Sequence, residues 1–127
     1  MTSENIFGGK RILLAEDDYF IVMQMVQDLE RSGAQVIGPI PSVEKALERL
    51  EKLANIDAAI LDINLQGNLV FPVAEELSRR GIPFVFASGY DDTIIPPRFA
   101  EVPLLDKTVD VKKIASVLFG VRASPAK

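Results

Sequence analysis

Short, uninterrupted apolar runs alternate with longer amphipathic stretches along the chain, and this alternation leaves few possible folds. Arg11–Ala15 is the first apolar run, and Ala34–Gly38 and Ala58–Leu61 each follow one amphipathic stretch. Two later runs, Pro83–Ala87 and Val102–Leu105, bring the set to five. Strands without polar alternation are typical of a parallel sheet covered on both faces. The order of elements therefore predicts a single doubly wound α/β domain.

The amphipathic stretches carry the signals that begin and end helices. Tyr19–Arg31 has apolar residues at helical spacing along one face. Ser42 is a suitable N-cap for a second helix, and Pro72 suits the first turn of a third helix that runs to Arg80. Asp110 can cap a last helix. These helices fall between the apolar runs, as an α/β fold requires.

One helix is missing from this rhythm, between the fourth and fifth strands. Residues 91–100 should form it, but Pro96 and Pro97 stand next to each other in this segment. A proline inside a helix costs about 3 kcal/mol because it removes a hydrogen bond and clashes with the preceding turn. We therefore expect a loop or a stub here.

The chain contains no cysteine and no histidine, and these absences exclude several kinds of chemistry. Thiol catalysis, disulfides, zinc sites built from Cys and His, and a Ser-His-Asp triad cannot be formed from this sequence. The chain also has no histidine that could carry a phosphoryl group. Carboxylates, hydroxyls, Lys, Arg and hard cations such as Mg²⁺ remain available.

The charge pattern bears on partners and location. The formal net charge is −4, and no dense run of Lys and Arg is visible in the sequence. We therefore expect no direct binding to nucleic acid or to an anionic membrane. Residues 1–9 have neither the charged start nor the apolar run of a signal peptide, and no apolar run approaches the length of a membrane span. We expect a cytoplasmic protein.

Polar residues follow the predicted strands at the points where the strands end. The first strand leads into Glu16-Asp17-Asp18, the third into Asp62, the fourth into Ser88 and the fifth into Asp106-Lys107. In an open parallel sheet, ligands bind at this carboxyl edge. Clustered carboxylates repel one another, and Mg²⁺ relieves the repulsion because it prefers oxygen ligands. Together with a lysine and a hydroxyl, such a site suits phosphoryl transfer.

Four short motifs resemble one known family. AEDD at Ala15–Asp18, LDINLQG at Leu61–Gly67, FASGY at Phe86–Tyr90 and DK at Asp106–Lys107 resemble the receiver domain of bacterial two-component response regulators. The resemblance runs from about Lys10 to Phe119. The fourth-strand motif is similar to that of the stand-alone receivers typical of alphaproteobacteria, which read Phe-Ala-Thr/Ser-Gly followed by an aromatic.

The resemblance implies a domain plan. The implied fold is the flavodoxin-like receiver fold, with a five-stranded parallel sheet in the order 2-1-3-4-5 and a fourth helix that is shortened or absent. Residues 1–9 would form an N-terminal tail, residues 10–120 the receiver domain and residues 121–127 a C-terminal tail, with no output domain.

The resemblance also implies the roles of individual residues. Asp62 would be the phosphoacceptor, whose phosphoryl group contacts Ser88 and Lys107. The implied Mg²⁺ ligands are Glu16, Asp17, Asp62 and the backbone carbonyl of Asn64, with Glu16 acting through water. Asp18 would begin the first helix instead of binding the metal, because a carboxylate is favoured at a helix N-terminus.

Two positions depart from the family pattern. Thr108 follows the lysine where the family usually has proline, which is often in a cis bond. Leu104 stands where the family usually has the aromatic residue that rotates on activation. We expect Tyr90, two residues after Ser88, to take over the role of that aromatic or to shield the aspartyl phosphate.

Three functions remain open at this stage. The first is a phosphorylatable single-domain response regulator. It would take a phosphoryl group from a histidine kinase or histidine phosphotransfer protein, and would signal to a downstream protein or act as a phosphate sink. The second is a degenerate receiver that is not phosphorylated and acts as a binding module. The third is an Mg²⁺-dependent phosphatase of the haloacid dehalogenase type, which Asn64 disfavours because those enzymes have a second Asp at that position. We expect no enzyme beyond phosphoryl uptake and slow self-dephosphorylation.

Overall fold

The computed structural model describes residues 5–89 and 94–120 of the chain. Its main sheet has five parallel strands in the order β2-β1-β3-β6-β7, which confirms the predicted order. These strands are β1 (Arg11–Ala15), β2 (Gln35–Ile40), β3 (Ala58–Asp62), β6 (Phe84–Ala87) and β7 (Leu104–Leu105).

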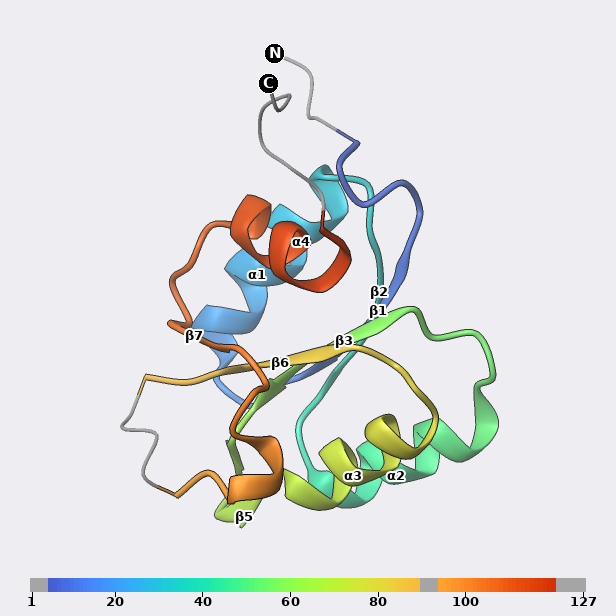
Figure 1. Cartoon of the computed structure of the whole chain (residues 1–127). Helices are drawn as coiled ribbons and strands as arrows, with labels where there is room; N and C mark the ends of the chain where they lie inside the picture. Colours follow the sequence, from blue (N-terminus) through green and yellow to red (C-terminus); the bar gives the residue numbers. More distant parts are fainter. Residues whose placement is uncertain (1–4, 90–93, 121–127) are drawn as a thin grey trace.

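Helices cover both faces of this sheet, as Figure 1 shows. Helices α1 (Tyr19–Arg31) and α4 (Val111–Phe119) lie on one face, and α2 (Val43–Lys52) and α3 (Phe71–Arg79) lie on the other. The N-caps are those that the sequence predicts for three of them, since the side chains of Asp18, Ser42 and Asp110 each accept backbone N–H groups of the first turn. In the described part of the chain, no helix has the length and apolar character needed to cross a bilayer.

The core is divided by the sheet into two clusters. One cluster lies between the sheet and helices α2 and α3, and the other lies between the sheet and helices α1 and α4. Phe7 belongs to the second cluster: its side chain is buried and its ring meets that of Phe119 edge to face. Part of the segment expected to be an N-terminal tail therefore contributes to the core.

The segment between β6 and β7 forms a single 3₁₀ turn, Pro97–Phe99, within its described residues, in agreement with the expected stub. Phe99 fills the space beneath this turn. Its ring stacks on Phe71 at a centroid distance of 5.8 Å and meets the rings of Phe84 and Phe86 edge to face. Residues 90–93, which include Tyr90, lie outside the described residues.

A small hairpin follows β3 and was not predicted. Its strands are β4 (Asn64–Leu65) and β5 (Asn68–Leu69), which pair antiparallel. The turn between them needs two residues with positive φ, Gln66 at 53° and Gly67 at 86°. The hairpin occupies the space between β3 and α3, beside the carboxyl end of the sheet.

Candidate functional site

The predicted polar residues gather at the carboxyl end of the sheet. A cavity of about 350 Å³ lies there, lined by Asp17, Asp18, Asp62, Asn64, Gln66, Gly67 and Lys107. Glu16 and Asp62 lie at the ends of the neighbouring strands β1 and β3, and their side chains are only 2% and 5% exposed. Carboxylates this deeply buried need partners, because an isolated buried charge is very unfavourable.

Lys107 is the partner of both buried carboxylates. Its Nζ lies 3.2 Å from Oε2 of Glu16 and 3.1 Å from Oδ2 of Asp62. The short strand β7 holds Lys107 in this place, since β7 pairs with β6 just before the Asp106-Lys107 step. One ammonium thus faces two carboxylates, so the centre of the site keeps an excess of negative charge.

That imbalance affects the ionisation of the site. Burial, together with repulsion from Asp62, raises the pKa of Glu16 from 4.5 to about 7. Burial opposes the charge on Lys107, but hydrogen bonds and attraction from Asp62 and Glu16 outweigh it and raise the pKa of Lys107. Lys107 is therefore a cation at neutral pH, and Glu16 is close to its midpoint when no metal is bound.

The unpredicted hairpin supports the exposed side of the site. The Gln66 N–H donates to Oδ2 of Asp17 at 2.8 Å, which ties the acidic run after β1 to the loop after β3. The Asn64 side chain accepts from the Gly67 N–H at 2.8 Å and so closes the turn. Sequence reasoning missed Gln66, although Gly67 in the polar run between Leu65 and Leu69 was a signal for a turn.

The acidic residues suit a hard divalent cation. Glu16, Asp17 and Asp62 each offer a carboxylate oxygen, and these three oxygens lie within 4.8 Å of one another. Oxygen donors and excess negative charge are what Mg²⁺ requires. Asp18 is used differently, because its Oδ1 accepts from the N–H groups of Phe20 and Ile21, as expected of a helix cap.

The remaining predicted residues surround this centre. Ser88 is buried, and it follows Ala87, the residue of β6 that pairs with Asp62. The Ser88 N–H donates to the carbonyl of Leu105. Leu104 is half-buried on β7 and packs against the core cluster that contains the phenylalanines. The predicted role of the Asn64 carbonyl stays a prediction.

Thr108 is accommodated without the cis bond that a proline there can adopt. Within the described residues, the one cis peptide bond joins Gly38 to Pro39, so the Lys107–Thr108 bond is trans. The backbone N–H and the hydroxyl of Thr108 both donate to Oδ1 of Asp106, at 2.8 and 2.7 Å. These hydrogen bonds lower the pKa of Asp106 and fix the turn that carries Lys107.

Similar solved structures include two of the protein SdrG. The solution structure of SdrG from Sphingomonas melonis Fr1 is 39% identical to this chain, covers 90% of it and 97% of SdrG, and has a TM-score of 0.77. The BeF3-activated conformation of SdrG from Pseudomonas melonis Fr1 is 39% identical over 93% of this chain and 96% of SdrG, with a TM-score of 0.69.

A more distant structure agrees in fold alone. The CheY-like response regulator receiver domain from Methylobacillus flagellatus is 21% identical, covers 90% of this chain and 99% of that domain, and has a TM-score of 0.73. No family model and no curated protein matches the sequence.

Proposed function

This chain belongs to the receiver domain family of two-component response regulators, and from that premise we propose that it accepts a phosphoryl group on Asp62. The donor is a histidine kinase or a histidine phosphotransfer protein. The phosphorylated chain then signals by contact with a downstream protein or serves as a phosphate sink. The contacts of Lys107 with both buried carboxylates carry this proposal, because they give Asp62 a cation that can also meet a phosphoryl group.

The proposed reaction is a transfer between two side chains. A carboxylate oxygen of Asp62 forms a bond to phosphorus, and the bond between phosphorus and the donor's imidazole nitrogen breaks. The electron pair of that bond stays on the imidazole, which takes up a proton from solvent. Because this chain has no histidine, the donor is another molecule.

The protein's own contribution is positioning and charge. Lys107 orients Asp62 through Oδ2, and the Asn64 N–H lies 3.4 Å from Oδ1 of the same carboxylate. After transfer, Lys107 and the Ser88 hydroxyl bind the phosphoryl oxygens. Asp17, Asp62, the Asn64 carbonyl and, through water, Glu16 would hold Mg²⁺, which would supply positive charge against the phosphoryl oxygens.

The surface beside the site supports a protein as donor. Tyr19, Phe20 and Met23 on α1 are 68%, 80% and 53% exposed, although all three are large and apolar. They begin directly after the Asp17-Asp18 pair, and an apolar hollow of about 250 Å³ separates Phe20 from Lys107 and Val109. Exposed apolar clusters of this kind mark protein contacts, and a donor protein that binds to this cluster would bring its histidine close to Asp62.

The test is a phosphorylation assay by intact mass. The protein is incubated with Mg²⁺ and acetyl phosphate, and we expect it to gain the mass of one phosphoryl group. Asp62→Asn should gain none. Asp110→Asn is the matched control, because Asn is an equally good N-cap and the site is untouched. If Asp62→Asn is labelled as fully as the wild type, the proposal is wrong.

The same assay separates the two alternatives. A phosphatase would turn over simple phosphate monoesters, and a degenerate receiver would neither gain an adduct nor release phosphate. The phosphatase is disfavoured by Asn64, whose side chain serves the hairpin turn instead of offering a second acid.

A further inference from the structure

A second charged surface lies on α2, away from the acidic site. Its cations recur at a spacing of four and then three residues: Lys45, Arg49 and Lys52. Residues at this spacing share one face of a helix. The acids Glu44, Glu48 and Glu51 repeat with the same period and form a neighbouring stripe. The helix therefore places its basic residues and its acidic residues on two different faces, although they are mixed along the sequence.

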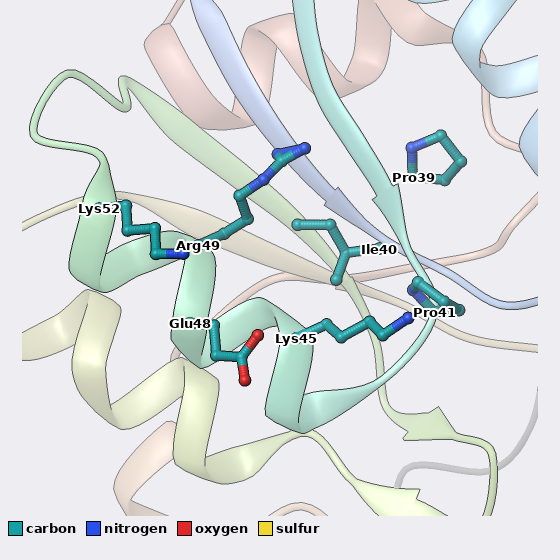
Figure 2. Close-up of a pocket in the computed structure, with 7 residues that line it drawn as sticks. All are labelled: Pro39, Ile40, Pro41, Lys45, Glu48, Arg49 and Lys52. Carbon is teal, nitrogen blue, oxygen red and sulfur yellow. The ribbon is translucent and has the colours of Figure 1, made fainter.

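The basic stripe faces a groove. The groove has a volume of about 370 Å³ and lies between α2 and the end of β2, where Pro39, Ile40 and Pro41 form the opposite wall. Figure 2 shows the Lys45 side chain extending from α2 toward Pro41, and the Arg49 side chain extending from α2 toward the strands of the sheet. Among the described residues, Glu48 is the one acid that lines the groove.

These cations are not neutralised by their own chain. Within residues 5–89 and 94–120, neither Lys45, Arg49 nor Lys52 has a carboxylate within ion-pair distance. Glu48 and Lys52 have the spacing of a helical ion pair, yet they form none. Lys45 and Arg49 carry like charges at a spacing that destabilises a helix. An anionic group bound in the groove would remove this repulsion.

The shape of the groove limits what can bind there. Pro39 and Pro41 have no N–H, so the end of the edge strand β2 cannot pair with an added strand through those residues. A ligand is therefore held by side chains. The prolines offer an apolar wall, and the cations offer charge on the other side.

We propose that this groove binds an acidic, extended segment of a partner protein. Lys45 and Arg49 are four residues apart, which is a rise of about 6 Å along the helix. In an extended peptide, alternate side chains point the same way and are about 6.7 Å apart. Two acidic residues separated by one apolar residue therefore match the spacing of these two helix positions, and the apolar residue faces the prolines.

The small extent of the basic stripe favours this class of ligand over long polyanions. The net charge is −4, and the basic stripe covers a single helix face. A nucleic acid or an anionic membrane would extend beyond the stripe and meet the acids around it. A short acidic segment does not.

The test is an NMR titration. The isotope-labelled full chain is titrated with the peptide Glu-Leu-Glu-Val-Glu, whose two termini are chemically blocked. We expect the peptide to shift the amide signals at the end of β2 and along α2, and to bind less tightly as salt is added. Lys45→Glu combined with Arg49→Glu should weaken binding about ten-fold. Lys113→Glu on α4 makes the same kind of charge change outside the groove and should leave binding unchanged.

Several results would overturn the inference. The first is that the peptide shifts no amide signals at the groove. The second is that Lys113→Glu weakens peptide binding as much as the double variant does. The third is that a DNA duplex, or vesicles of equimolar phosphatidylserine and phosphatidylcholine, bind to the same residues more tightly than the peptide. Circular dichroism checks that the double variant is folded, and Glu48→Gln, which should tighten binding, tests the groove without removing a cation. The experiment contains no phosphodonor and is repeated with Asp62→Asn, so its outcome is independent of phosphorylation.

Discussion

The strongest quantitative prediction concerns Glu16 in the metal-free protein. Its carboxyl is buried beside Asp62, and its pKa is raised from 4.5 to about 7. The folded chain therefore binds this proton more tightly than the unfolded chain does. The stabilisation is complete below pH 4.5 and is lost as the pH rises through about 7.

The size of the effect follows from the same values. The difference between 4.5 and about 7 corresponds to about 3 kcal/mol of unfolding free energy, at about 1.4 kcal/mol for each pH unit. Glu16→Gln removes the titration but keeps an oxygen that can accept from Lys107 and from the Asp18 N–H. Relative to the wild type, the variant should therefore gain about 3 kcal/mol between pH 4.5 and pH 8.

The assay is urea unfolding at several pH values in the presence of a chelator, followed by circular dichroism. Comparing the two proteins at each pH cancels the titration of every group that does not interact with Glu16. Glu101→Gln, at an exposed position, is the matched control and should run parallel to the wild type. If Glu16→Gln also runs parallel to the wild type from pH 4.5 to 8, the argument that burial and Asp62 raise this pKa is refuted.

Three further predictions concern the metal and the core. Mg²⁺ should stabilise the wild type by about 2.7 kcal/mol at a hundred-fold excess over its dissociation constant, and Asp17→Asn should remove most of the shift in a thermal melt. Gly38→Ala should cost more than Gly67→Ala in urea unfolding: both have positive φ, but only at Gly38 would the added Cβ meet a backbone oxygen, that of Leu14, at 2.7 Å. Phe99→Ala should cost about 3–5 kcal/mol in the same assay, because this ring is buried against other phenylalanines.

Much of the fold could be predicted because local signals agree with the tertiary arrangement. Tyr19–Arg31 and Arg11–Ala15 have the predicted bounds, and the predicted caps are used. Smaller differences arise where packing decides the end of an element. β2 continues to Ile40 because the carbonyl of Ile40 accepts from the Glu16 N–H. Only two residues of Val102–Leu105 pair as a strand.

The sequence predicts which residues make up the candidate site, but not how their side chains contact one another. The rule that strand ends meet at one edge brings Glu16, Asp62 and Lys107 together without any structure. It cannot say that one ammonium bridges both carboxylates, since that depends on how deeply each side chain is buried. The contact of Gln66 with Asp17 joins residues 49 positions apart through a backbone N–H, and such a contact leaves no mark on residue types.

The packing of the 3₁₀ turn between β6 and β7 also constrains how the site can report its state. Phe99 is in contact with three other rings, so it cannot swing outward without opening the core. Leu104, at the position of the family's rotating aromatic, packs against the same cluster and has no ring to move. Neither residue can therefore serve as that switch. We therefore propose that Tyr90, which follows Ser88 and Gly89 in the chain, is the residue that senses phosphorylation.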